Sequence, residues 1–433
     1  MTDENKAKQS FYDSVLLVLT LKRHREGVWI HRLVEALERT RRKHTNGVAE
    51  RDIGIRVVAL EDMLSSPFVA EDWFSSRYYN EDWLRNKDLS HENNHRRLRS
   101  RIIGLVNRVS DAAPPTLFKA CMAVLSSAES RHIPIFNGPR SYTMSSNKWC
   151  HHVLFDQAKL KSPPTAAFFS ATHRDSTDAG KQFQEATQLT MHRRQKKAAA
   201  NTKNESLNSP NFGSITAEEG HDILIKPNAG GFGEGIVRVS LGEATAGSLS
   251  GSLTMPEYSD QMTLIQSYVS PNNLCLYRIW YLLGKVQCAV ERRLDPELPS
   301  THEEFTTACA GGNVCTRRPK RQRMEPQDVI FQQFVAWEVP EEVRKELEER
   351  FLPTLPADAH CGSVEFLDDS TRSLDSTVAR QRLYFDWNLL STLPINVEET
   401  SRKSIWPAKY DPWDELAIGI WEFVAMKNCG RDA

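Results

Sequence analysis

A glycine-rich stretch between two strand-like segments carries residues suited to holding phosphate groups. It covers residues 222–235 (DILIKPNAGGFGEG) and contains Gly230, Gly231, Gly233 and Gly235. Glycines accept positive φ angles and let the backbone approach a ligand closely, so that successive N–H groups can point at phosphate oxygens. Lys226 adds a point charge for the same phosphates.

The segments around this stretch indicate which kind of phosphate loop it is. A Walker loop needs GxxxxGK[ST] at the start of a helix, and this pattern is absent. A dinucleotide fingerprint needs a strand, GxGxxG and then a helix, whereas residues 236–239 alternate as a strand. We therefore predict a hairpin whose tip lies over phosphates, with an ordinary glycine-rich turn as the alternative. We expect Lys226 to lie outside the hydrophobic core.

Oxygen-donating side chains alternate with apolar ones along residues 382–388 (RLYFDWN). In a strand, Asp386 and Asn388 share one face. The opposite face then carries three apolar side chains, Leu383, Phe385 and Trp387. Glu365 lies in the preceding strand-like segment (SVEFL), and a hairpin places it opposite the polar pair. Such oxygen ligands suit Mg²⁺, which completes its shell with water and phosphate; the alternative is a solvated polar face of an antiparallel sheet.

The elements that must position these groups begin with an N-terminal α/β domain. Short apolar runs predict buried strands at residues 15–20, 55–60, 102–106 and 133–137. Helical spacing predicts helices at residues 28–42 and 117–129. Strands that alternate with helices indicate a parallel sheet with helical covers, and we predict this domain over residues 1–137.

The rest of the chain predicts strands that pair as hairpins. Predicted strands cover residues 165–169, 222–239, 264–269, 276–292, 362–367 and 382–388, and predicted helices cover residues 148–160, 340–352 and 413–426. Residues 175–220 are poor in apolar side chains, and we predict a mobile insertion there. Residues 295–327 form a second polar insertion.

Composition excludes several classes of protein. The 433 residues carry a formal net charge of −1, so we expect no nucleic-acid partner. No run of about 20 apolar residues predicts a membrane span, and the N-terminus lacks a secretory signal. Eight cysteines without CxxC pairs fit a reduced, intracellular protein. His151 and His152 are adjacent and share no helix face, which argues against a joint metal role.

Two basic runs leave the location open between the cytoplasm, which we predict, and the nucleus. They are HRRQKK at residues 192–197 and RRPKRQR at residues 317–323. Such runs occur in nuclear-localisation signals and nucleic-acid-binding patches. Neither run has the interleaved aromatic residues on which bases stack, and a solvated charge run in an insertion explains both.

The ordered set of motifs in residues 137–395 resembles the ATP-grasp superfamily, in particular its amino-acid-ligating branch typified by glutathione synthetase and the ribosomal protein S6 modification ligase. The matching segments are NGPRSYTMSSNK, AKLKSPPT, ILIKPNAGGFGEG, LIQSYV, YRIWYLLGKVQCAVERR, VEFL and FDWN. The resemblance implies an α/β fold: a Rossmann-like pre-ATP-grasp domain, then a two-lobed ATP-grasp domain of α+β type. The lobes would cover residues 138–269 and 270–433.

The resemblance implies a site for ATP. The residues that would bind it are Lys148, Lys226, Gly230, Gly231, Gly233, Gln266, Tyr268 and Val269. In this scheme the lysines hold the α- and β-phosphates, the glycines close over the triphosphate, and Gln266 meets the adenine edge. The main chain at Tyr268 and Val269 helps to bind adenine. Other members often have Glu where this chain has Gln266, which puts the strength of adenine recognition in doubt.

The resemblance also implies a metal site and two catalytic arginines. Glu365, Asp386 and Asn388 would hold one or two Mg²⁺ ions, or Mn²⁺. Arg278 and Arg292 would face the γ-phosphate and the substrate carboxylate, where a planar fork binds in a bidentate manner. Arg293 is the alternative to Arg292. The position two before Arg278, often Asp in this branch, is Leu276, which puts ribose or substrate contacts there in doubt.

The implied activity is that of an ADP-forming ligase joining a small-molecule carboxylate to an amine through an acyl phosphate. Two other activities fit the same resemblance. The first is a non-catalytic ATP-binding regulator, as in the synapsin-like members, and the second is a small-molecule kinase, because inositol phosphate kinases resemble this fold. We expect no membrane partner, and a homo-oligomer is an open alternative to a monomer.

Overall fold

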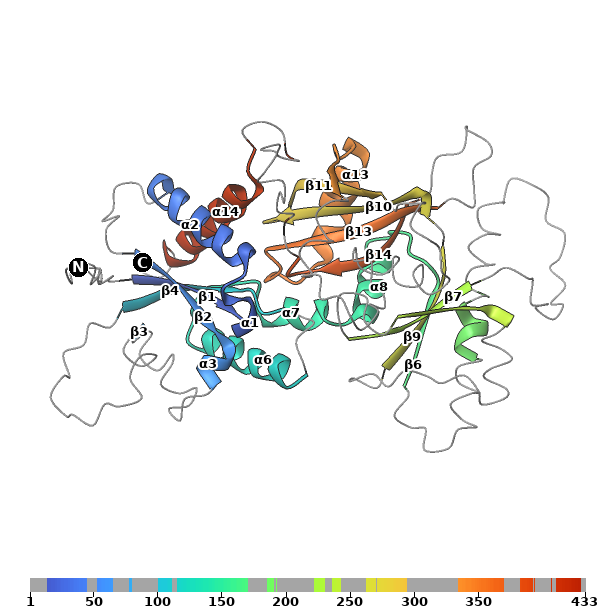
Figure 1. Cartoon of the computed structure of the whole chain (residues 1–433), viewed down its shortest axis with the longest axis horizontal. Helices are drawn as coiled ribbons and strands as arrows, with labels where there is room; N and C mark the ends of the chain where they lie inside the picture. The colour runs from blue at the N-terminus through green and yellow to red at the C-terminus, as the bar shows by residue number, and fades with distance from the viewer. Residues whose placement is uncertain are drawn as a thin grey trace, which may run out of the picture.

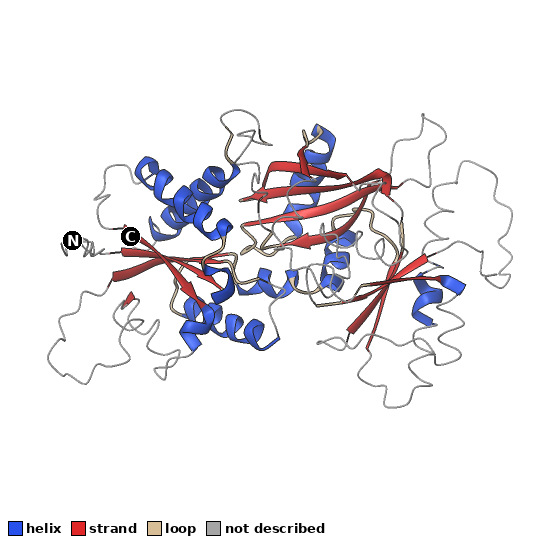
Figure 2. Cartoon of the chain, viewed as in Figure 1, coloured by secondary structure: helices blue, strands red, loops and turns tan. Residues whose placement is uncertain are grey.

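The computed structural model contains three β-sheets that follow one another along the long axis of the molecule (Figure 1; Figure 2). The structure describes residues 14–44, 53–64, 78–79, 100–110, 115–169, 185–190, 192, 222–229, 236–242, 262–269, 271–293, 334–369, 382–391, 393, 406 and 410–429. Within these residues, no helix combines the length and apolar character needed to cross a membrane.

The first sheet is the predicted parallel sheet with helical covers. Its parallel strands are β2 (Ile53–Ala59), β1 (Ser14–Thr20), β4 (Ser100–Asn107) and β5 (Ile135–Phe136), and β3 (Tyr78–Tyr79) pairs antiparallel with β4. The helices of this region are α1 (Lys22–Arg25), α2 (Val28–His44), α3 (Leu60–Leu64) and α6 (Pro115–Ser130). Every residue of β1 after the first is buried, as expected for a parallel strand covered on both faces.

The second sheet is antiparallel and contains the predicted glycine hairpin. Its strands, in spatial order, are β6 (Thr165–Phe169), β9 (Met262–Ser267), β7 (Asp222–Pro227) and β8 (Val237–Ser240). Ile225 of β7 pairs with Val237 of β8, so the glycine stretch joins two neighbouring strands as predicted. Gly230, Gly231 and Gly233 themselves lie outside the described residues.

The third sheet is also antiparallel and carries the predicted polar strands. Its order is β12 (Phe334–Ala336), β11 (Lys285–Arg293), β10 (Pro271–Leu282), β13 (Cys361–Asp369) and β14 (Arg382–Asn388). Leu283 and Gly284, both with positive φ (46° and 78°), turn the chain between β10 and β11. A two-residue turn of this kind matches the twist of the strands that it joins.

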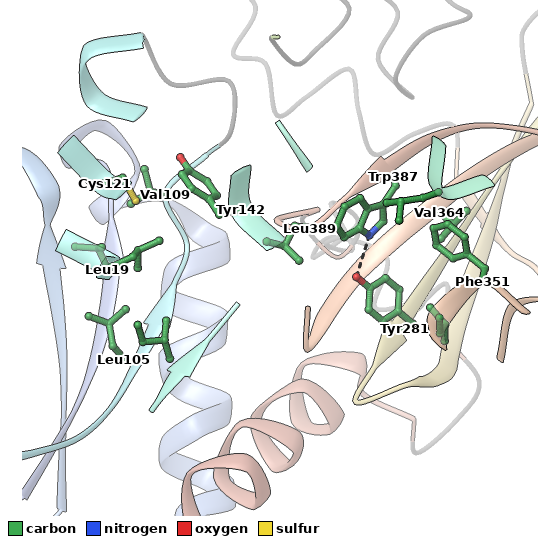
Figure 3. Close-up of a cluster of buried hydrophobic side chains, with 14 of the residues drawn as sticks. Leu19, Leu105, Val109, Cys121, Tyr142, Tyr281, Phe351, Val364, Trp387 and Leu389 are labelled. Carbon is green, nitrogen blue, oxygen red and sulfur yellow. Dashed lines mark hydrogen bonds between the residues drawn. The ribbon is translucent and has the colours of Figure 1, made fainter. Parts of the chain in front are cut away.

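One face of the third sheet packs against helices from two parts of the chain. These are α8 (Lys148–Gln157), which follows α7 (Pro139–Ser145), and α13 (Glu341–Glu346), which continues as a π-helical turn (Leu347–Phe351) and a 3₁₀ turn (Leu352–Thr354). Figure 3 shows Phe351, Val364 and Trp387 in this core, where Trp387 Nε1 donates a hydrogen bond to Tyr281 Oη (2.9 Å). The same apolar cluster extends to Leu19 and Tyr142 beside the first sheet.

The C-terminal helix α14 (Pro412–Cys429) returns to the N-terminal part of the molecule. It lies beside α2 in Figure 1, and Trp421 Nε1 donates to the carbonyl oxygen of Leu37 (3.1 Å). The apolar cluster around α14 also includes Trp280 and Cys288 of the third sheet. The helix predicted at residues 413–426, within the C-terminal lobe, therefore joins the first sheet to the third.

Part of the segment predicted to be a mobile insertion is ordered. Residues 185–190 are helical, and Ala186 and Thr190 are buried against the second sheet, where Thr190 Oγ1 donates to Ile265 O (3.3 Å). The buried side of this short helix consists of Ala186, Thr187 and Thr190, whereas Leu189 is exposed. The polar insertion at residues 295–327 lies outside the described residues.

Candidate active site

The second sheet places Lys226 and Gln266 on one face. Lys226 pairs with Leu264 across the sheet, and Gln266 pairs with Leu224, two residues before Lys226, so both side chains project from the same side. Lys226 Nζ donates to Gln266 Oε1 over 3.0 Å. Lys226 is only 3 % exposed, so the expectation that it lies outside the core is wrong. It is buried because β9 and α8 cover the strand end.

Gln266 is held by three partners at once. Its Oε1 accepts from Lys226, and its Nε2 donates to Thr165 Oγ1 (2.9 Å) and lies 3.3 Å from His152 Nε2. Thr165 lies directly opposite Gln266 on β6. Gln266 therefore orients Lys226 in this state, and its contact with an adenine ring stays a prediction.

Lys148 is brought to the same place by the start of α8. Asn147 caps this helix by accepting from Cys150 N (3.1 Å), and Lys148 is 7 % exposed. The residue that fixes both lysines is Asn228, just after β7: its carbonyl accepts from Lys148 N (2.9 Å) and its Oδ1 from Trp149 N (2.8 Å). Asn228 was not identified as a functional residue from the sequence alone. Its position directly after Lys226 and Pro227, at the end of a predicted strand, could have indicated its role.

Burial and two neighbouring charges together set the pKa of Lys226. Burial lowers the pKa of its ammonium group to about 7, the charge of Asp386 opposes this change, and the charge of Lys148 adds to it. Lys148 and Lys226 are therefore both close enough to Asp386 to interact with it, although Asp386 belongs to the third sheet. Lysines of α8 and β7 and a carboxylate of the third sheet therefore face one site.

The predicted hairpin of polar strands is present in the third sheet. Glu365 of β13 pairs directly with Asp386 of β14, and they are 2 % and 6 % exposed. Asn388 Nδ2 donates to Glu365 Oε1 and to Asp386 Oδ2, both at 3.1 Å. Among the three side chains predicted as metal ligands, Asn388 therefore contacts both carboxylates.

The prediction that Leu383, Phe385 and Trp387 share one face of their strand is wrong. The register between β13 and β14 shifts between Glu365 and Phe366, which is the effect of a β-bulge. As a result Leu383 and Phe385 pack in one cluster, with Leu276, whereas Trp387 packs in the other. The bulge leaves Asp386 opposite Glu365, so the polar group is unaffected.

Arg278 completes the polar group from the neighbouring strand. It pairs with Glu365 across β10 and β13, and its Nη2 lies 2.5 Å from Glu365 Oε1. Arg292 of β11 pairs with Leu276 of β10, and Arg293 pairs with Cys275. The choice between these two arginines stays a prediction.

His151, in the first turns of α8, links that helix to Asp386. It is 1 % exposed; its Nδ1 lies 3.0 Å from Asp386 Oδ1 and its Nε2 donates to Ser145 O (2.8 Å). Burial alone would raise the pKa of Asp386, but the hydrogen bond and charge of His151, with the charges of Lys148 and Lys226, hold it well below its usual range. Asp386 is therefore a carboxylate at neutral pH.

The two adjacent histidines contact different partners, His151 reaching Asp386 and His152 reaching Gln266. This agrees with the expectation that they do not share a metal. Among the described residues, no group of three or more His, Cys, Asp and Glu side chains is arranged to hold a metal ion. The predicted set has two carboxylates and one amide.

The strand end at Tyr268 and Val269 connects the second sheet to the third. Tyr268 N donates to Asp222 O (3.0 Å), and the guanidinium of Arg238 lies 3.9 Å from the centre of the Tyr268 ring. Val269 packs with Leu276 in a cluster of the third sheet. The backbone predicted to bind adenine thus lies at the junction of the two sheets.

Comparison with known proteins identifies the fold. No family model matches the chain, and no curated protein matches its sequence. Among solved structures it is similar to the D-cycloserine synthetase DcsG (14 % identity, 94 % of this chain and 99 % of that chain, TM-score 0.50). It is also similar to D-alanyl-alanine synthetase A from Vibrio cholerae O1 biovar eltor str. N16961 (12 %, 96 % and 99 %, 0.50). The ATP-grasp ligase PsnB aligns over 95 % of this chain and 99 % of its own, with 13 % identity and a TM-score of 0.49. The chain has the predicted ATP-grasp fold.

Proposed function

From the ATP-grasp fold, we propose that this chain is an ADP-forming ligase that joins a carboxylate to an amine with ATP and Mg²⁺. One observation carries the proposal: two buried lysines from α8 and β7 share their electrostatic environment with Asp386, and Asp386 contacts Asn388 and, through it, Glu365. Cations that bind phosphate and oxygen ligands that bind a divalent metal lie together, as phosphoryl transfer requires. The synthetases with a similar fold support the same class of reaction.

The donor set fits Mg²⁺. Two buried carboxylates and one amide oxygen are hard ligands, and Mg²⁺ usually takes one or two carboxylates and completes its shell with water and phosphate. Asn388 now directs Nδ2 at both carboxylates, so its amino group lies where a cation would meet the same oxygens. Rotating the amide by half a turn presents Oδ1 instead. When bound, the ion would neutralise charge on the β- and γ-phosphates.

The other residues of the site bind the phosphates, position the lysines and hold the substrate. Lys148 and Lys226 bind the α- and β-phosphates, and Gln266 and Asn228 keep the two lysines in position. Arg278 holds Glu365 through Nη2, and its guanidinium has further N–H donors for the substrate carboxylate or the transferred phosphate. Arg292, whose backbone pairs with Leu276 of β10, acts together with Arg278. The glycines at 230, 231 and 233 cover the triphosphate and exclude water.

The proposed reaction has two steps. A carboxylate oxygen of one substrate attacks the γ-phosphorus, the bond to the β-phosphate oxygen breaks, and ADP leaves. The amine nitrogen of the second substrate then attacks the carbonyl carbon of the acyl phosphate, phosphate leaves, and the nitrogen loses a proton. Arg278 stabilises the oxyanion formed during this attack. No protein nucleophile takes part in either step.

Thermal unfolding of the purified chain with Mg·ATP, followed by an assay for ADP, tests the proposal. At about 100 times its Kd, ATP should stabilise the folded state by about 2.7 kcal/mol, and ADP should appear only when a carboxylate and an amine are both present. Stabilisation without ADP formation under any acceptor would indicate a regulatory ATP-binding protein. Phosphate transferred to a hydroxyl group would indicate a kinase, and no stabilisation would contradict the site.

His151 is expected to act as a positioning residue for Asp386. Replacing it by Phe keeps a ring against Trp387, with ring centroids 5.8 Å apart and planes inclined at 73°, but removes the hydrogen bonds with Asp386, Ser145 and the Trp387 backbone. The Mg²⁺ concentration needed for half of the ATP-dependent stabilisation should rise by about 10- to 100-fold. His151→Gln, which keeps one N–H donor, should recover part of this loss. A lower unfolding temperature with an unchanged Mg²⁺ requirement would show a merely structural role.

A further inference from the structure

A cavity lies where the end of β4 meets the third sheet and the start of α14. We call it the Arg108 cavity, and its walls include Arg108, Trp280, Cys288, Cys361, Ser391 and Glu415. Its volume is about 30 Å³, room for about two waters or one carboxylate group. Arg108 directly follows β4, and the carboxyl ends of parallel strands are where α/β sheets bind ligands.

Arg108 is a buried cation with spare hydrogen-bonding capacity. Its side chain is 4 % exposed, and Nη2 makes a long contact of 3.5 Å to Leu390 O. Within the described part of the chain, Nε has no hydrogen-bond partner. The guanidinium carbon lies 5.0 Å from the centre of the Trp29 ring, which holds the group in place. Burying a charge without a counter-charge is costly, so this arrangement favours an anionic ligand.

Two further groups in the cavity wall can donate to the same ligand. Among the residues that the structure describes, Trp280 Nε1 and Ser391 Oγ are buried and have no hydrogen-bond partner. An indole nitrogen can only donate, and a hydroxyl can donate. Together with Arg108 they form a set of donors around one small space. Since buried polar groups in folded proteins nearly always have a partner, this set indicates a ligand rich in acceptors.

The nature of the wall favours a carboxylate over a phosphate. Glu415 lies in the same wall, and this carboxylate disfavours a ligand group that carries two negative charges itself, such as a phosphate. The two wall thiols do not add charge, because burial raises the pKa of Cys361 and raises that of Cys288 to about 12. A single negative charge, shared by a planar pair of oxygens, matches the guanidinium of Arg108.

The cavity lies on the same strand face as the proposed metal site. Cys361 in its wall, Ser363 and Glu365 alternate along β13, and Trp280 stands two residues from Arg278 on β10. At about 3.3 Å per residue, Cys361 and Glu365 are about 13 Å apart along the strand. Ser363, between them, is fully buried. The Arg108 cavity and the proposed metal site are therefore separate sites on one sheet face.

We propose that the Arg108 cavity binds the carboxylate group of a small organic acid, with Arg108 and Trp280 as the residues that recognise it. The proposal rests on the donors of the cavity and stands apart from the proposed ligase function.

Binding of glutarate to the full chain, followed by thermal unfolding, tests the inference. Glutarate should stabilise the wild type, and its uncharged diamide, glutaramide, should not; inorganic phosphate should act more weakly than glutarate. Arg108→Met should weaken glutarate binding by about 10- to 100-fold, as expected for losing a charged hydrogen bond. Trp280→Phe, which keeps the ring, should weaken it by about tenfold. Arg39→Met is the control, because Arg39 pairs with Asp414 of α14 (2.7 Å) on the exposed side.

Stability without ligand separates a binding role from a structural one. Arg108→Met removes an unpaired buried charge, so the apo chain should unfold at the same temperature or higher. An apo chain that unfolds earlier while glutarate binding is unchanged would overturn the inference, as would a wild type that glutarate does not stabilise. Mg·ATP is measured in the same samples. If Mg·ATP stabilises the chain and glutarate does not bind, the carboxylate site in the cavity is contradicted and the proposed function stands. If glutarate binds and Mg·ATP does not stabilise the chain, the proposed function is contradicted and the carboxylate site stands.

Discussion

Lys226→Met is expected to abolish stabilisation by Mg·ATP and to leave the apo fold intact. Lys226 is 3 % exposed. Its ammonium group, which now donates to Gln266, is the donor that β7 contributes to the proposed phosphate site. Methionine fills a similar volume without the charge, so the core keeps its packing while the site loses its cation. The loss should equal the full ligand effect, about 2.7 kcal/mol at 100 times the wild-type Kd.

The same variant should change how stability depends on pH. Burial lowers the pKa of Lys226 to about 7, whereas a lysine in the unfolded chain keeps its ordinary pKa of 10.5. Between these values the unfolded chain binds more protons than the folded chain, so wild-type stability gains on the order of a few kcal/mol as pH rises from 7 toward 10. Lys226→Met should lack this gain.

Urea unfolding at pH 7 and at pH 9.5, for both chains, measures the difference. Other groups titrate in this range, but they cancel when the variant is subtracted from the wild type. The exposed Lys161 supplies a matched control, and Lys161→Met should behave as the wild type at both pH values. Unchanged ATP affinity in Lys226→Met would contradict the assignment of the phosphate site.

The elements that carry the site were predictable because their signals are local. The start of α8 at Lys148 follows from the capping residue Asn147, and the β13–β14 pairing that joins Glu365 to Asp386 follows from two strand patterns separated by a polar turn. Hairpins and caps depend on residues near in sequence. The ordered motifs then predicted the ATP-grasp fold, which the structural comparisons confirm.

The contacts that tune the site were not predictable, because they join residues far apart in the chain. His151 meets Asp386 across 235 positions, and Gln266 meets His152 across 114. A single sequence shows residue types and not such pairings, so both histidines and Asn228 were missed as positioning groups. The bulge opposite Glu365 had no local signal either, since residues 382–388 read as an uninterrupted alternation. Likewise, nothing in residues 412–429 shows that this helix packs on α2.

Asp386→Asn is the second change with a large expected effect, and it should raise the Mg²⁺ concentration that ATP binding needs more than it weakens ATP binding at saturating Mg²⁺. Asp386 is the carboxylate that both lysines and His151 hold ionised, and an amide at this position is a weaker ligand for a hard cation. The Mg²⁺ requirement should rise by at least about 100-fold, since even changes one shell further out cost 10- to 100-fold.

The same variant should also be less stable without ligand, because it loses a buried charge that balances the lysines. Asp386 is the counter-charge of a buried cluster, and removing one partner of a buried pair costs about 3–5 kcal/mol, so the apo variant should unfold earlier. Asp358→Asn is the control: Asp358 accepts from the backbone N–H groups of Arg140 and Ser141 at the start of α7, and its loss should lower stability without altering the Mg²⁺ requirement. Titrating Mg²⁺ at fixed ATP, with the unfolding temperature as readout, separates the two effects. If Asp386→Asn keeps the wild-type Mg²⁺ requirement, the ion is held elsewhere and the polar strands of the third sheet serve only to balance the two lysines.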